Sequence, residues 1–374
     1  MTLFDGYRPH SSFLYGTSER ALHAKGATVT LPGRGPEAPA RAAAVLRALG
    51  GDAIVVGAIP FADDEPARLV VPEHYRWGPP ITGAAVPRVG ATVRAEPTEE
   101  HYLSAVHKAL SMMDGGGLAK TVLARSLVLR PNRPVDLPAL LRGLAGRDPR
   151  GHTFAVPLPR RRVLAGASPE LLVRRRGRVV TAHPLAGSRP RTGDGRDTAA
   201  VAELRASDKD HREHAHVVDA ITAALAPYCS RLRVPEPEVT GTAAMWHLGT
   251  LITGELADPG TTALELACAL HPTPAVCGTP TGAAREAITA LEGFHRGFYA
   301  GMVGWTDAAG DGEWAVAIRC AEFAEGEIRL FAGAGIVPGS HPDRELAETT
   351  AKFTTLLAGL GLEDGDVRRV HHVA

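Results

Sequence analysis

The chain has 374 residues, which is enough to bury a full core as one large domain or as two ordinary ones. Its 41 lysine and arginine residues balance its 41 aspartate and glutamate residues, so its charge argues against nucleic acid or an anionic membrane as the main partner. No stretch approaches the roughly 20 apolar residues of a membrane helix, and the start has no basic segment followed by an apolar run. We therefore expect a cytoplasmic protein that acts on a small molecule.

The first part of the chain alternates helix-type and strand-type patterns, which is typical of an α/β fold. An alanine-rich helical segment over 38–50 precedes the apolar strand pattern of 53–60. A helix is predicted over 98–113 with Thr98 as its N-cap, and the alternating strand that follows includes Lys120. The four cysteines are scattered without a Cys-x-x-Cys pair, so we expect reduced, packed thiols.

The second part of the chain continues this alternation without a long linker or an internal repeat. Residues 185–197 are rich in glycine, proline and arginine and are interpreted as a loop, and 197–228 are predicted to form one long amphipathic helix. Residues 313–335 contain two alternating runs joined by a short turn at Gly326, the pattern of a β-hairpin. We expect a single intertwined domain over 1–374.

The predicted helix over 197–228 is crowded with acids and with three histidines, His211, His214 and His216. Residues three or four apart share a helix face, so Asp210 and Glu213 are neighbours, whereas the third histidine points away from the other two. This geometry argues against a zinc site, because the histidines cannot converge and the chain supplies no paired Cys or His partner. A solvated helix face with mixed charges is the simplest interpretation.

A second acidic pair lies far downstream, where Glu345 and Glu348 are three residues apart on another predicted helix. If the two pairs face each other, carboxylates about 4 Å apart repel by roughly 4 kcal/mol at an effective dielectric constant of about 20. Such a cluster either takes up protons or binds a cation, and ligands that are all oxygen favour magnesium.

Eight segments, taken in chain order, resemble the chorismate-utilising enzymes and, within that family, the isochorismate synthases. They are "AKTVLARSLVL", "LAGASPELLVRR", "HPLAGSRPR", "SDKDHREH", "MWHLGT", "LACALHPTPAVCGTP", "EWAVAIRCAEF" and "LFAGAGIVPGSHPDRELAETTAK". The resemblance runs from about Lys120 to Lys352. It implies a single large chorismate-binding domain of long antiparallel sheets flanked by helices, in α/β/β/α layers.

The resemblance implies a magnesium-dependent isomerisation of chorismate to isochorismate, in which water adds at C2 of the ring and the C4 hydroxyl leaves. This chemistry needs a base for the water and an acid for the departing hydroxyl, and Lys120 and Glu170 match the family's residues for these roles. A lysine is a base only when its amine is neutral, and the glutamic acid must keep its proton, as a shielded carboxyl group can. Without the resemblance, Lys120 would be interpreted as a solvent-exposed lysine at a strand end and Glu170 as a residue in the first turn of a helix.

The resemblance also implies contacts to the metal and the substrate. Glu213 and Glu348 match the magnesium carboxylates of the family, with Asp210 and Glu345 as supporting or water-mediated partners. Arg319 matches a guanidinium that holds a substrate carboxylate in a bidentate fork. The other residues that match substrate contacts are Gly187, Ser188, His247, Ala275, Gly333, Ala334, Gly335 and Lys352.

A few positions separate the reactions within the family. Lys120 favours water over the ammonia that anthranilate-forming relatives use, and Ala186 stands where aminodeoxychorismate relatives carry a nucleophilic lysine. Salicylate synthases share the lysine and the glutamate, and they then eliminate pyruvate from isochorismate. A salicylate synthase is therefore the alternative to an isochorismate synthase. Val276 stands where relatives carry leucine, which leaves that elimination open.

The pathway and the partners are weaker expectations. The lean chain favours 2,3-dihydroxybenzoate supply for siderophores, with menaquinone biosynthesis as the other route, and we expect a monomer that binds chorismate and isochorismate. A non-catalytic protein that binds metal through the histidine cluster is the competing hypothesis. The retained base, acid and metal carboxylates argue against it.

Overall fold

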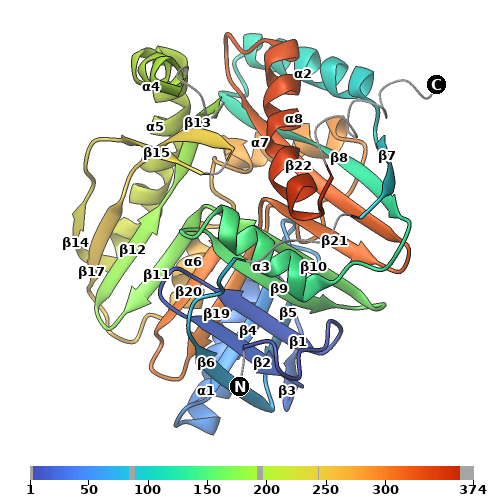
Figure 1. The fold of residues 1–374 in the computed structure, drawn as a ribbon. Coiled ribbons are helices and arrows are strands. Elements are labelled where there is room, and N and C mark those ends of the chain that lie inside the picture. Colours follow the sequence, from blue (N-terminus) through green and yellow to red (C-terminus); the bar gives the residue numbers. More distant parts are fainter. Residues whose placement is uncertain (1–2, 84–88, 192–196, 243, 363–374) are drawn as a thin grey trace.

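The computed structural model describes residues 3–83, 89–191, 197–242 and 244–362. Over these residues, the chain forms two large antiparallel sheets with helices packed on them (Figure 1). The predicted α/β fold of antiparallel sheets flanked by helices is therefore confirmed. Within the described ranges, no helix is both long enough and apolar enough to cross a membrane.

The first sheet has ten strands and joins the N-terminal hairpin to strands from the middle and the end of the chain. Its order is β18 (Gly278–Thr279), β8 (Lys120–Pro131), β22 (Glu327–Ile336), β21 (Cys320–Ala324), β10 (Arg162–Ser168), β9 (His152–Leu158), β1 (Ser12–Gly16), β2 (Ala21–Lys25) and β6 (His74–Gly78), and β7 (Ala91–Ala95) also pairs with β8.

The second sheet has nine strands, and a smaller sheet of three strands lies beside the two large ones. The nine-stranded order is β14 (Cys229–Arg233), β17 (Ile252–Leu256), β12 (Val179–His183), β11 (Leu171–Arg176), β20 (Gly312–Val316), β19 (Met302–Asp307), β4 (Ile54–Ile59), β5 (Arg68–Val71) and β3 (Val29–Leu31). The small sheet has the order β13 (Leu185–Pro190), β16 (Met245–Gly249) and β15 (Glu238–Gly241).

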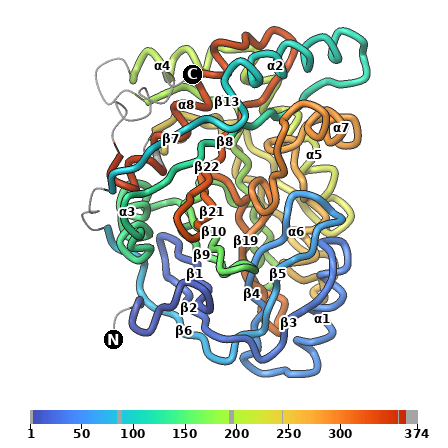
Figure 2. The backbone as a smooth tube through the Cα atoms, turned by 90° about the vertical axis from the view of Figure 1, so that its right-hand side faces the viewer, coloured from blue at the N-terminus to red at the C-terminus, as the bar shows by residue number. Residues whose placement is uncertain are grey.

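In the described part of the chain, six of the helices pack against the two large sheets, and the other two pack against the small sheet (Figure 2). The helices are α1 (Ala38–Leu49), α2 (Glu99–Asp114), α3 (Leu137–Arg147), α4 (Asp197–Ala206), α5 (Asp208–Leu225), α6 (Ala263–Leu270), α7 (Thr281–Leu291) and α8 (Pro342–Gly359), with short 3-10 turns at Gly35–Glu37 and Ala226–Tyr228. Helices α3 and α8 pack on the first sheet, whereas α1 and α6 pack on the second.

Two apolar cores hold these layers together. The larger core contains Tyr15 and Phe154 between the two large sheets, and Trp314 on the opposite face of the second sheet, on the side of helix α6; each of the three is almost fully buried. The smaller core lies between the first sheet and helices α3 and α8, where Leu140 and Phe353 have no exposed surface. Burial of each such side chain stabilises the fold by about 1.5–3 kcal/mol, so the sheets form a firm support for the residues at their edges.

The chain passes from one large sheet to the other at two neighbouring places. It leaves β10 for β11 through Pro169 and Glu170, and it leaves β20 for β21 through residues 317–319. The two passages lie side by side, because the N–H of Ala167, two residues before the first passage, donates to the carbonyl of Arg319 in the second at 3.1 Å. The predicted hairpin over 313–335 is therefore only partly right, since its first run is divided between the two sheets and only β21 and β22 form the hairpin.

Two other predicted elements differ in the structure. The single helix predicted over 197–228 is wrong, because Ser207 separates α4 from α5. Ser207 has an extended backbone, and its hydroxyl accepts from the N–H of Asp210 at 3.3 Å, so it caps a new helix. The loop predicted over 185–197 is wrong in its first half, which forms β13; residues 192–196 lie outside the described part.

Candidate active site

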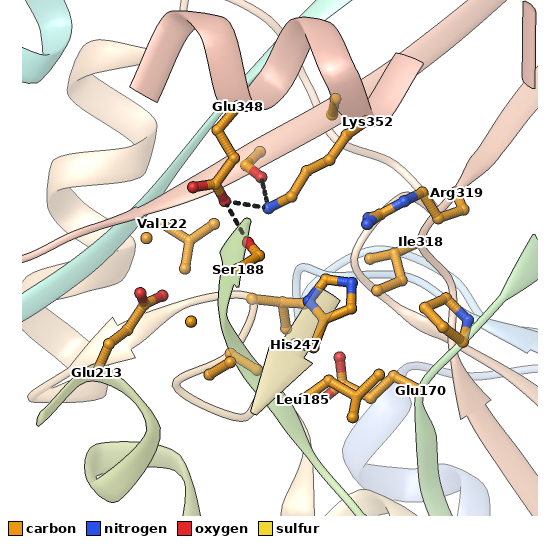
Figure 3. Close-up of a pocket in the computed structure, with 18 of the residues that line it drawn as sticks. Val122, Glu170, Leu185, Ser188, Glu213, His247, Ile318, Arg319, Glu348 and Lys352 are labelled. Atoms are coloured by element: carbon orange, nitrogen blue, oxygen red, sulfur yellow. Dashed lines mark hydrogen bonds and ion pairs between the residues drawn. The ribbon is translucent and has the colours of Figure 1, made fainter. Parts of the chain in front are cut away.

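A pocket lies where β22, the small sheet and helices α5 and α8 come together (Figure 3). Most of the residues that the family pattern singles out line this pocket. They are Glu170, Gly187, Ser188, Glu213, His247, Ala275, Arg319, Gly333, Gly335, Glu348 and Lys352.

Glu170 is the buried acid of the pocket, with 3% of its surface exposed. It lies between two strands, so the helical first turn that the residue pattern alone indicated is wrong. Burial raises the pKa of Glu170 to about 8, although the charges of Lys120, Arg319 and Lys352 oppose this rise. The carboxyl group therefore keeps its proton at neutral pH and can donate it.

Lys120 begins β8 and has no exposed surface, so the alternative of a solvent-exposed lysine is wrong. Its Nζ lies 3.2 Å from Oε1 of Glu213 and 3.5 Å from the carbonyl oxygen of the same residue. Gly335 leaves the room for this contact, because a Cβ there would stand 1.9 Å from Oε1 of Glu213. Lys120 thus stands behind the pocket wall, in contact with a carboxylate that lines it.

Two groups hold the side chain of Glu348 on α8, one from the small sheet and one from α8 itself. The Ser188 hydroxyl donates to Oε1 of Glu348 at 2.9 Å, and Nζ of Lys352 lies 2.7 Å from the same oxygen. Lys352 also donates to the carbonyl of Gly333 at 2.8 Å. Burial alone would raise the pKa of Glu348, but the charge and hydrogen bond of Lys352, with that of Ser188, hold it below its usual value. Glu348 is therefore an ionised carboxylate facing the pocket (Figure 3).

Asp210 and Glu345 stand behind the pocket wall, each paired with a cation. Nη2 of Arg189 lies 2.7 Å from Oδ2 of Asp210, and Nζ of Lys209 lies 2.7 Å from Oε1 of Glu345. Burial and the nearby charge of Glu348 raise the pKa of Glu345, and Lys209 opposes that rise. The sequence reasoning missed both cations, although each lies inside a quoted motif next to a residue that it assigned.

Arg319 and His247 present polar atoms that have no hydrogen-bond partner among the described residues, namely Nη2 and Nε2. Arg319 has a left-handed backbone with φ of +50°, a conformation that is costly for a residue with a side chain. Burial and the charges of Arg319 and Lys352 hold the pKa of His247 well below its usual value, so its imidazole is neutral. Buried polar atoms are nearly always paired, and a bound anionic molecule would pair these two.

An apolar and aromatic wall completes the pocket and includes Val122, Leu185, Ile318, Tyr299 and Phe331. The rings of Tyr299 and Phe331 stack with centroids 4.9 Å apart. Sequence reasoning missed these residues, because their pattern is that of ordinary core positions. The reverse holds for Ala334, which was expected to contact substrate but does not line the pocket, since neighbouring residues of a strand face opposite sides.

A family model described as chorismate binding enzyme matches residues 84–361. The chain belongs to the chorismate-binding enzyme family. It is 52% identical over 323 residues to the isochorismate synthase DhbC of Bacillus subtilis, covering 83% of this chain and 81% of that one. It is 44% identical over 319 residues to the vibriobactin-specific isochorismate synthase of Vibrio cholerae, covering 84% of this chain and 81% of that one.

A solved structure supports the same assignment. The crystal structure of a putative 2,3-dihydroxybenzoate-specific isochorismate synthase, DhbC from Bacillus anthracis, superposes with a TM-score of 0.92 at 46% identity. The match covers 96% of this chain and 99% of that chain. The layered sheets and helices described above are therefore the fold of a chorismate-binding enzyme.

The donor atoms of this chorismate-binding enzyme fit a magnesium ion. Glu213 and Glu348 bring carboxylate oxygens into the pocket from different helices (Figure 3). No cluster of three or more histidine, cysteine or acidic side chains suited to a metal occurs within the described ranges. Magnesium does not need such a cluster, because it keeps several waters and takes one or two carboxylates together with substrate oxygens.

The histidines of α5 in this chorismate-binding enzyme point in different directions. Nε2 of His211 lies 3.0 Å from the carbonyl oxygen of Arg205, and Nε2 of His214 lies 2.7 Å from the hydroxyl of Thr250. Burial, with the charge of Lys120, lowers the pKa of His214 to about 4, so it is a neutral, packed side chain. Of the polar residues crowded in this stretch, Glu213 lines the pocket and the three histidines do not.

Proposed function

We propose that the chain isomerises chorismate to isochorismate by adding water at C2 and releasing the C4 hydroxyl, and that the product feeds 2,3-dihydroxybenzoate and siderophore synthesis. The observation that carries this proposal is Glu170, a buried pocket acid whose pKa of about 8 keeps it protonated at neutral pH. The similarity to relatives named for isochorismate synthesis gives independent support.

The two proton transfers are assigned to residues that burial keeps away from bulk water. Lys120 accepts a proton from the attacking water, and the ammonium that forms is stabilised by Oε1 of Glu213, 3.2 Å from Nζ. Glu170 donates a proton to the leaving hydroxyl. Each transfer contributes about 10² to 10⁴ in rate, so we expect loss of either residue to lower the rate at least by this factor.

Magnesium is assigned to Glu213 and Glu348, with Asp210 and Glu345 as supporting partners. When bound, Mg²⁺ would supply the positive charge that holds a carboxylate of the substrate. Lys352 and Ser188 hold the pKa of Glu348 below its usual value, so this carboxylate need not lose a proton to bind a cation. Lys209 and Arg189 hold the two supporting acids in place from outside the pocket.

The remaining pocket residues are assigned to binding. Arg319 forms a fork for the second substrate carboxylate, and its unpaired Nη2 supports this assignment. Lys352, Ser188 and His247 donate to substrate oxygens, while the backbone at Gly187, Gly333 and Gly335 leaves room for close approach. Ala275 forms part of the wall. We further propose a single domain over 1–374, a cytoplasmic monomer, and no nucleic acid or membrane partner.

Incubation of the purified protein with chorismate, with and without Mg²⁺, tests the proposal, with products identified by mass spectrometry. Isochorismate formed only with the metal is the expected result. Salicylate together with pyruvate would indicate the salicylate synthase alternative, for which Val276 in the pocket wall is the relevant difference. If no product forms with Mg²⁺ present, both reactions are refuted.

A further inference from the structure

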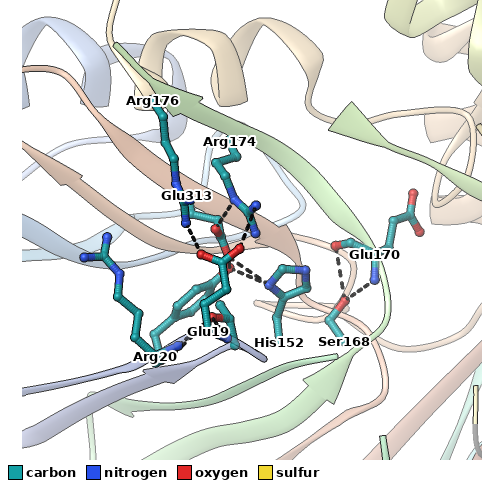
Figure 4. A network of polar contacts seen from close by, with 10 residues as sticks. Glu19, Arg20, His152, Ser168, Glu170, Arg174, Arg176 and Glu313 are labelled. Carbon is teal, nitrogen blue, oxygen red and sulfur yellow. Dashed lines mark hydrogen bonds and ion pairs between the residues drawn. The ribbon is translucent and has the colours of Figure 1, made fainter. Parts of the chain in front are cut away.

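Four polar side chains, three of them buried and one partly exposed, form a cluster close to Glu170 but outside the pocket (Figure 4). At its centre is Glu313, which is 4% exposed. Its Oε1 accepts from the hydroxyl of Tyr15 at 3.1 Å and lies 3.1 Å from Nδ1 of His152, and its Oε2 accepts from Nε of Arg174. We call Tyr15, His152, Arg174 and Glu313 the polar clasp.

The contacts within the clasp keep Glu313 ionised and Tyr15 protonated. Burial alone would raise the pKa of Glu313, but hydrogen bonds and charges from His152 and Arg174 lower it to about 2, so this carboxylate is ionised. Burial and the charge of Glu313 raise the pKa of Tyr15 well above its usual value, so the phenol keeps its proton. Nδ1 of His152 also lies 3.0 Å from the hydroxyl of Tyr15. When Nδ1 carries the ring proton, His152 donates to Glu313, because an ionised carboxylate only accepts hydrogen bonds.

The clasp joins the two large sheets. Tyr15 on β1 and His152 on β9 belong to the first sheet, whereas Arg174 on β11 and Glu313 on β20 belong to the second. Arg174 and Glu313 are also directly opposite each other in the ladder between β11 and β20. The bonds across the clasp therefore fix the separation of the sheets at the place where the chain passes from one to the other.

Glu170 is anchored to β10, which pairs with the clasp strand β9, and to the clasp strand β20. His152 is directly opposite Ser168 in the pairing of β9 with β10, and the Ser168 hydroxyl accepts from the N–H of Glu170 at 3.2 Å. On the other side, the carbonyl of Glu170 accepts from the N–H of Val316 at 3.1 Å, three residues beyond Glu313 on β20. A change in the spacing of the sheets would move both anchors of Glu170.

Stability alone does not account for a buried charge at this place. Replacing a buried ion pair by apolar side chains of similar volume is often neutral or even stabilising, because both ions lose their hydration on folding. Directional hydrogen bonds, in contrast, set one geometry, which matters for an acid that must meet a leaving group. A misplacement of about 1 Å can cost a factor of about 10² in rate.

We propose that the polar clasp positions Glu170, with His152 and Glu313 as positioning residues that never touch the substrate. This inference rests on the proposed function, in which Glu170 is the acid for the leaving hydroxyl. Because the clasp lies outside the pocket, its loss should lower kcat for isochorismate formation and leave KM for chorismate nearly unchanged.

A pair of variants at one position provides the central test. His152→Leu removes the donor at Nδ1, and we expect kcat to fall about 10- to 100-fold while KM stays within about twofold. His152→Asn places an amide N–H near the position of Nδ1, so we expect kcat within about threefold of the wild type. A purely structural role for the side chain would not produce this rescue together with an unchanged KM.

Two further variants make the test robust. Tyr15→Phe deletes a single hydroxyl from the clasp and leaves the packing intact, so it should lower kcat in the same way if His152→Leu fails to fold. Glu19→Gln is the control, because the Glu19 side chain is 49% exposed and pairs with Arg176 and Arg174 at the solvent end of the same network (Figure 4). We expect wild-type kcat and KM for Glu19→Gln.

The outcomes separate this inference from the proposed function. Wild-type kcat in both His152→Leu and Tyr15→Phe would refute the positioning role while leaving the reaction assignment intact. A kcat loss that His152→Asn does not rescue, or that comes with an equal change in KM, would also refute it. If the wild type makes no isochorismate, the proposed function is refuted, and the inference that rests on it is refuted as well.

Discussion

Replacing Glu170 by glutamine should stop catalysis and yet stabilise the fold at neutral pH. The pKa of Glu170 is raised from an ordinary 4.5 to about 8, mainly by burial. Between these values, the folded chain holds a proton that the unfolded chain releases, so the contribution of Glu170 to stability is fully present below about pH 4.5 and falls as the pH rises. Glutamine is a neutral isostere without this loss.

The size of the effect follows from the two pKa values. One pKa unit corresponds to 1.36 kcal/mol, so the wild type loses less than about 1 kcal/mol at pH 5 and about 3 kcal/mol at pH 7, and the loss approaches about 5 kcal/mol near pH 9. Any pH-independent difference between the two side chains cancels when two pH values are compared. The stability advantage of Glu170→Gln should therefore grow by about 2–3 kcal/mol from pH 5 to pH 7.

Urea unfolding of both proteins at pH 5 and pH 7 measures this difference, with isochorismate formation assayed in parallel. We expect Glu170→Gln to show no hydration activity at either pH. A stability difference that is the same at both pH values would refute the reasoning, because Glu170 would then titrate as an ordinary carboxyl group. Measurable isochorismate formation by the variant would instead refute its role as the acid.

Other predictions concern the base, the metal and the substrate fork. Lys120→Gln should abolish hydration without unfolding the chain, and wild-type reaction in heavy-oxygen water should label the C2 hydroxyl; an unlabelled product contradicts the role of Lys120. Glu213→Gln should lower the Mg²⁺-dependent activity far more than joint replacement of the three histidines on α5. A larger loss in the histidine variant, measured over a Mg²⁺ titration, would indicate a metal site built from the histidines. Arg319→Lys should raise KM for chorismate by about tenfold or more, since lysine cannot form the bidentate fork; an unchanged KM would place the substrate carboxylate elsewhere.

Much of the pocket could be anticipated because its residues lie in short local motifs with strong patterns. The strand that begins at Lys120 and the helix that carries Glu348 were both predicted and are present. Residue spacing also indicated that Asp210 and Glu213 share one helix, and both are on α5. Such features depend on neighbours within one or two turns, which the sequence displays directly.

The remaining features depend on long-range contacts that leave no local pattern. Alternating apolar residues continue through 313–324, and nothing in that alternation marks where the chain changes sheets. Ser207 has a high preference for a helix N-cap, but it lies between two helical patterns in phase, so the break was missed. The pairing of Lys209 with Glu345 joins helices more than a hundred residues apart, and only the fold brings them together.

The two passages of the chain between the sheets also determine how this pocket can change. Glu170 lies in one passage and Arg319 in the other, so the distance between the acid and the guanidinium is set by how the two sheets pack on each other. A substitution in the apolar layer between the sheets, for example at Phe154, would therefore alter the pocket without touching it. The packing that stabilises the fold therefore also sets the separation of Glu170 and Arg319. The activity of the enzyme can change in evolution through residues that never contact the substrate.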